Sequence, residues 1–179
     1  MNLVIYLLAL LSVLGAFDTI YYHEWRARLP ALGSAAKSEL RLHAFRDFVY
    51  AILFGTLPWF AWRGWCAAAL SFLFLTEVVL TLWDFVVEDS VRKRLGGVYP
   101  IERVMHGIMG IVYGAMLTAI APVVARWWAA TPSGIFGSPS TVSEPLQWAM
   151  AIMALGVFIS GIRDLCASAN LSGSAWPWK

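Results

Sequence analysis

Charged residues are scarce in this chain of 179 residues. Only 13% of its residues are charged, whereas 60% are hydrophobic, and the mean hydropathy is +0.68. An ordinary soluble domain is about 25% charged and about 45–50% apolar. The composition therefore argues against a soluble domain and predicts an integral membrane protein. The net charge of +2 is too small to indicate a nucleic-acid partner.

Cysteine and histidine are also rare. The two cysteines, Cys66 and Cys166, form no C-x-x-C motif and fall in opposite leaflets of the topology predicted below, so neither a disulfide framework nor a thiolate metal site is expected. With only three histidines, the chain does not resemble the membrane desaturases and alkane hydroxylases, which carry many histidines in H-x3-H and H-x2-H-H boxes.

Long apolar segments, by contrast, are abundant. A helix needs about 20 mostly apolar residues to cross a bilayer. Five such spans are predicted, near 3–24, 39–61, 65–88, 101–125 and 145–165. They predict a single all-α membrane domain over 1–179, a bundle of five transmembrane helices. A very short turn at 62–64 joins the second and third spans, and an irregular loop over 131–145 precedes the fifth. No basic region precedes the first span, which favours a retained helix over a cleaved signal segment.

Basic residues lie almost entirely on one side of this arrangement. Eleven of the 13 Lys and Arg residues lie in or beside the loops that follow spans one and three, or after span five, and the other two are Arg63 and Arg126. Because Lys and Arg are enriched in cytoplasmic loops, the N-terminus is predicted to be extracytoplasmic and the C-terminus cytoplasmic. The expected location is the inner or plasma membrane of the cell.

Acids and histidines gather at the predicted cytoplasmic ends of the spans. Glu39 and His43 are four residues apart, and so are Glu102 and His106, a spacing that places both side chains on one face of a helix. Ionisable residues at membrane depth are costly and usually mark a functional site. The predicted metal ligands are His23, Glu39, His43, Asp84, Glu102, His106, Asp18 and Glu88.

These ligand types restrict the metal. Mixed carboxylate and imidazole ligands suit iron, manganese and zinc. Ferritin-like di-iron proteins build two-metal sites in helical bundles from Glu residues and Glu-x-x-His pairs, whereas this chain has Glu-x-x-x-His, so the likeness is one of chemistry and not of family. The predicted cofactor is a pair of divalent transition-metal ions, iron first, with zinc or manganese as alternatives.

The predicted function follows from such a site. We expect a membrane metalloenzyme, a metal-dependent oxidoreductase that hydroxylates or desaturates a lipid or another hydrophobic small molecule, with an electron-donor protein as partner. Hydrolysis at zinc is the nearest variant. The alternatives are a divalent-metal or proton transporter with Glu77 on its route, a haem-binding membrane protein, and a structural subunit with charges at the interface. The short chain is compatible with a homo-oligomer.

Further charged residues are expected around the ligands. Three arginines and a tyrosine are predicted to orient ligands or to pair with surplus carboxylates: Arg41, Arg46, Arg103 and Tyr22. Asp164, next to Arg163 at the end of the fifth span, is predicted to form an ion pair with it at the interface.

Overall fold

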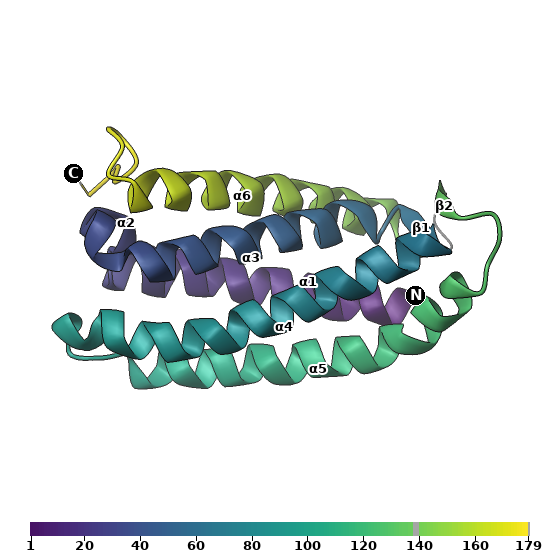
Figure 1. The fold of residues 1–179 in the computed structure, drawn as a ribbon, viewed down its shortest axis with the longest axis horizontal. Coiled ribbons are helices and arrows are strands. Elements are labelled where there is room, and N and C mark those ends of the chain that lie inside the picture. The colour runs from purple at the N-terminus through teal and green to yellow at the C-terminus, as the bar shows by residue number, and fades with distance from the viewer. Residues whose placement is uncertain (138–139, 179) are drawn as a thin grey trace.

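The protein is an elongated bundle of helices in a computed structural model that describes residues 1–137 and 140–178 (Figure 1). The long helices of this part of the chain are α1 (Asn2–Phe17), α3 (Lys37–Thr56), α4 (Trp65–Arg92), α5 (Pro100–Trp128) and α6 (Glu144–Ser168). The five predicted spans thus each correspond to a helix. The N-terminus lies at the same end of the bundle as the two strands, and the C-terminus lies at the other end (Figure 1).

Four of these helices are long and apolar enough to cross a membrane. They are α1 with its continuation to Arg26, α4, α5 and α6. Their outward surfaces carry large exposed hydrophobic residues, such as Phe72, Leu75 and Val86 on α4, as expected where a helix faces hydrocarbon. Helix α3 is shorter, at 20 residues, and has a higher density of charged residues, and it packs between α4 and α6. These features are those of a membrane protein.

The continuation of α1 is a π-helix, η1 (Asp18–Arg26), which turns more widely than an α-helix. Because a π-helix pairs residues i and i+5, it aligns Asp18 and His23 on one face. An α-helix would align positions three or four apart instead. Short elements follow and complete that end of the bundle: α2 (Leu29–Leu32), η2 (Gly33–Ala36) and, after α4, η3 (Lys93–Leu95).

The half of the bundle nearest the N-terminus has an apolar core. Ile5, Leu8, Leu53, Leu70 and Met116 are fully buried there, where α1, α3, α4 and α5 meet. Burying a side chain of this kind stabilises a water-soluble fold by about 1.5–3 kcal/mol, and in a membrane close packing takes over that role. Most of the buried ionisable side chains lie in the other half of the bundle.

Two short strands pair where the sequence predicted a turn and an irregular loop. Strand β1 (Phe60–Arg63) is antiparallel to β2 (Gly134–Gly137), with Phe60 opposite Gly137 and Arg63 opposite Gly134. Helix α3 therefore ends at Thr56 and not near residue 61. Pro58 explains the early end, because proline has no N–H to continue the helix and restricts the residue before it.

Candidate metal centre

Buried polar side chains from five helical segments meet in the half of the bundle opposite the strands. All eight predicted ligands lie here, and each is at most 9% exposed. They come from η1, α3, α4 and α5, and α6 adds Asp164. We call these nine residues together with Arg46 and Arg92 the polar cluster. Residues far apart in the sequence are thus brought together, as the positions of the acids and histidines at the span ends indicated.

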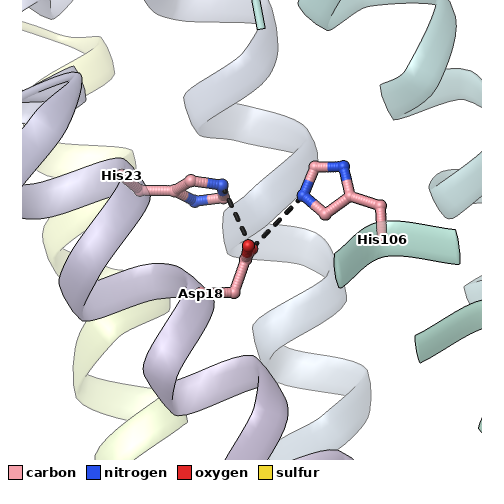
Figure 2. Close-up of side chains that lie close together, drawn as sticks. All are labelled: Asp18, His23 and His106. Carbon is pink, nitrogen blue, oxygen red and sulfur yellow. Dashed lines mark hydrogen bonds and ion pairs between the residues drawn. The ribbon is translucent and has the colours of Figure 1, made fainter. Parts of the chain in front are cut away.

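Asp18 joins two histidines from different helices (Figure 2). Its Oδ2 lies 3.3 Å from Nε2 of His23 and 3.3 Å from Nε2 of His106. The π-helix brings Asp18 and His23 together, while His106 approaches from α5. One ligand atom of each of the three residues lies within 4.8 Å of the others. This buried group can hold a metal ion.

The spacing of these atoms suits such an ion. A tetrahedral ion with bonds of about 2.0–2.1 Å separates its ligand atoms by about 3.3–3.4 Å. Two of the three separations, from Asp18 Oδ2 to Nε2 of each histidine, are 3.3 Å and agree with that value. All three residues are buried, so an ion held between them would be largely shielded from water.

Two glutamates extend this group. Glu102 Oε1 lies 3.5 Å from the same His23 Nε2 atom that faces Asp18, so it can supply a further oxygen ligand. Glu88 Oε2 lies 3.5 Å from Nδ1 of His106, the ring nitrogen directed away from Asp18. A carboxylate on that nitrogen orients the ring and makes it a better ligand.

A second group forms around His43. Its Nε2 lies 3.3 Å from Oδ2 of Asp84 and 4.0 Å from Oε1 of Glu39, while its Nδ1 lies 4.0 Å from Oδ2 of Asp164. The rings of His43 and His23 stack, with their centroids 4.5 Å apart and their planes at 8°. The two groups therefore adjoin each other.

Two arginines hold the carboxylates of the cluster. Arg92 is 0% exposed and donates from Nε to Glu39 Oε1 at 2.8 Å, while its Nη2 lies 2.7 Å from the same oxygen and 3.2 Å from Glu102 Oε1. Arg46 donates from Nη1 to Asp84 Oδ2 at 2.9 Å. A guanidinium stays charged in proteins and matches carboxylate geometry, so each arginine fixes its partners and offsets their charge.

Arg92 was not predicted to belong to the site, because it lies among the basic residues after the third span. The sequence did carry a signal for it. Asp84, Glu88 and Arg92 follow one another at intervals of four residues, so all three project from the same side of α4.

Several carboxylate oxygens of the cluster have no hydrogen-bond donor among the described residues. They include Oδ1 of Asp18, Oε2 of Glu39, Oδ1 of Asp84 and Oε2 of Glu102. Buried polar atoms nearly always have a partner, and those without one point to an additional ligand. Oxygens of this kind are ligands for divalent metals, so the chemistry of the cluster fits a bound cation.

Two of the arginines predicted to orient ligands lie outside the cluster. Arg103 is exposed and pairs with the exposed Asp89 at 3.0 Å. Arg41 is exposed on α3. Both lie beside buried acids in their helices, but the helical turn directs them outward. Of the three predicted arginines, only Arg46 contacts a predicted ligand.

Asp164 was expected to pair with Arg163, and that expectation is wrong. Arg163 instead donates to both carboxylate oxygens of Glu24. Asp164 is buried and faces His43. Neighbouring residues on a helix point about 100° apart, so the two side chains diverge.

Glu77 lies deeper in the bundle and is only 2% exposed. Its Oε1 accepts hydrogen bonds from Tyr50 Oη at 2.8 Å and from Thr81 Oγ1 at 2.7 Å, and Arg46 Nη2 lies 4.0 Å away. Glu77 lines a cavity of about 250 Å³ that also reaches His106. Arg46 therefore links Glu77 to the polar cluster.

A larger cavity of about 330 Å³ lies between α1, η1, α3 and α6, and we call it the chain cavity. Asp18, His23 and His43 line it at the polar cluster. Leu11 and Phe54 line it deeper in the bundle. The candidate metal group is thus adjacent to a cavity whose far part is apolar.

Comparison of the chain with protein-family models, with curated proteins and with solved structures found no match.

Proposed function

We propose that this protein is a membrane metalloenzyme that oxidises a hydrophobic molecule held in the chain cavity. The observation that carries the proposal is the position of the candidate metal group. Asp18 and His23 belong to that group and also line the chain cavity. A molecule in the cavity would therefore lie against the metal ligands, where an enzyme needs its substrate.

The polar cluster offers enough ligands for two adjacent ions. The first would be held by Asp18, His23 and His106, with Glu102 beside them. The second would be held by His43 with the buried oxygens of Asp84 and Glu39. We propose iron for both positions, because carboxylate and imidazole ligands suit it. Bound iron would supply the activation of oxygen, with two electrons delivered by an electron-donor protein.

The residues of the chain would prepare the site in three ways. Arg46 and Arg92 hold Asp84 and Glu39 in place and offset part of the negative charge. Glu88 contacts Nδ1 of His106, which leaves Nε2 free for the ion. The apolar walls of the chain cavity exclude water and leave room for a hydrocarbon.

The basic residues beside the polar cluster support a cytoplasmic orientation for this end of the bundle. The site would then lie near the cytoplasmic leaflet of the inner or plasma membrane, within reach of a soluble electron donor. The substrate would enter from the surrounding lipid.

The apolar half of the bundle favours an enzyme over a transporter. Ile5, Leu8 and Leu53 fill its interior with buried hydrocarbon. A transporter needs polar groups that line a route to the other side, and such groups lie near the middle of the membrane in many families. Glu77 is the deepest acid of the described core, and two hydroxyl groups already satisfy its Oε1.

Labelled oxygen tests this proposal directly. The protein would be produced in bacterial membranes under ¹⁸O₂, together with a His23→Ala/His106→Ala variant and, as matched control, Asp89→Asn, which changes an exposed acid. We expect hydrophobic products that carry one oxygen-18 atom, or that are two hydrogens lighter, with the wild type and the control only. Identical metabolite profiles for all three, at equal protein levels, would contradict oxidative function.

A further inference from the structure

The chain cavity is elongated along the bundle. Its lining residues run from His43 to Phe54 on α3 and from Met153 to Asp164 on α6, which is about 16 Å along each helix axis at about 1.5 Å per residue. A cavity of about 330 Å³ that extends over this length has room for an extended hydrocarbon chain.

The two ends of the chain cavity differ in chemistry. The deep end is lined by Leu11, Phe54 and Met153, which offer only apolar surface. The other end is lined by polar side chains, among them Asp47, Asp164 and Ser160. The ligand that fits is therefore an amphiphile, with its tail toward the middle of the membrane and its head beside the polar cluster.

The charge at the polar end selects the head group. Among the described residues, Asp47 has no ion pair, and Asp164 has only that with His43, whose Nδ1 lies 4.0 Å from Oδ2 of Asp164. The two arginines nearby are already paired: Arg46 with Asp84, and Arg163 with Glu24. The carboxylates of Asp47 and Asp164 therefore favour a ligand with a cationic head and repel one with an anionic head.

One buried atom beside the chain cavity lacks a partner. Oδ1 of Asp18 has no hydrogen-bond donor among the described residues, whereas Nε2 of His23 lies 3.3 Å from Oδ2 of Asp18, and both residues line the chain cavity. A chain with its head at Asp47 and Asp164 would run past these two residues toward Leu11.

We propose that the chain cavity binds a long-chain amine, a molecule with one hydrocarbon chain and a cationic nitrogen head. This inference names the substrate class for the proposed function and rests on it for the reaction, but binding itself requires no metal. The acids at the polar end disfavour a fatty acid, because its head is anionic. The carbons that are oxidised are those near the amine head, because the metal group lies at the polar end of the chain cavity.

The route of entry is lateral. Gly156 lines the chain cavity and is exposed on the surface of α6, and an added Cβ there would meet no atom within 4 Å. Gly15 on α1 also lines the cavity and is equally unobstructed. In a membrane this surface faces lipid, so a single chain can enter between the two helices.

Ligand competition tests the proposal. Radiolabelled dodecylamine would be bound to protein purified in digitonin, which carries a rigid steroid body and no alkyl chain, and displaced by unlabelled dodecylamine, dodecanol or dodecanoate. We expect dodecanoate to compete at least tenfold more weakly than dodecylamine, with dodecanol between them. Equal competition by dodecylamine and dodecanoate would overturn the assignment of a cationic head.

Variants locate the binding. Gly156→Leu adds a branched side chain at the outer opening of the chain cavity and should weaken dodecylamine binding at least tenfold, whereas Gly107→Leu adds the same side chain to an open, exposed position of α5 outside that cavity and should leave binding unchanged. Asp47→Asn with Asp164→Asn should weaken dodecylamine at least tenfold but not dodecanol. Undiminished dodecylamine binding by Gly156→Leu would show that the amine binds elsewhere.

The same measurement on metal-stripped wild type separates the two proposals. We expect dodecylamine to bind within threefold of its affinity for the untreated protein, so a failure of the metal proposal would leave this result intact. The competition series needs only wild-type protein, and it therefore stands even if the Asp47→Asn/Asp164→Asn variant does not fold. Loss of binding in every metal-free preparation would contradict the claim that the cavity alone selects the amine.

Discussion

Replacing Arg92 by methionine should destabilise the protein strongly. The guanidinium is 0% exposed and contacts the carboxylates of Glu39 and Glu102, which are also 0% exposed. Methionine fills much of the same space but leaves both carboxylates without their cation. Removing one partner of a buried ion pair costs about 3–5 kcal/mol, because the remaining charge stays buried and unpaired.

That cost can be measured as a shift in the thermal midpoint of the detergent-purified protein, in the presence of a chelator. For a chain of this size about 1 kcal/mol corresponds to about 2–4 °C, so about 3–5 kcal/mol predicts a fall of about 6–20 °C. Arg103→Met is the matched control, because it breaks an exposed pair worth about 0–1 kcal/mol.

A charge-balanced variant tests the reason for the loss. Arg92→Met combined with Glu39→Gln and Glu102→Gln removes the uncompensated carboxylates and should recover a large part of the midpoint. If Arg92→Met melts within about 2 °C of the Arg103→Met control, the guanidinium does not hold these acids and the reasoning is refuted.

Two further substitutions test how the ends of the bundle are held. Gly64→Ala should lower the thermal midpoint, because φ is +57° at Gly64 and an added Cβ would lie 1.9 Å from Oγ of Ser133; Gly137→Ala, which meets no atom within 4 Å, should not, and equal midpoints would refute this account. Arg163→Ala should speed proteolytic removal of the C-terminal segment in a mass-spectrometric digest, since Arg163 donates to Glu24 and to two backbone carbonyls of that segment. Unchanged cleavage rates would contradict that role.

Local spacing in the sequence predicted much of the polar cluster. Glu39 with His43 and Glu102 with His106 share helix faces because four residues make about one turn. Their presence at matching ends of neighbouring spans then indicated that they would meet. Composition and span length were likewise sufficient to predict five long helices.

Other features depend on tertiary structure and were not accessible in this way. The π-helix aligns Asp18 with His23, but nothing in the local composition distinguishes it from an α-helix. The inward direction of Arg92 depends on buried partners from α3 and α5. The pairing of β1 with β2 joins segments more than seventy residues apart, so no local pattern predicts it.

The metal content of the purified protein tests the central claim most directly. Inductively coupled plasma mass spectrometry would be applied to the wild type, to His23→Ala/His106→Ala and to Asp89→Asn, all purified in parallel. The proposed function predicts about two irons per chain in the wild type and in the Asp89→Asn control, with the ion at Asp18, His23 and His106 lost from the double variant. Trace metal in all three, unchanged by the histidine substitutions, would contradict a metal centre in the polar cluster.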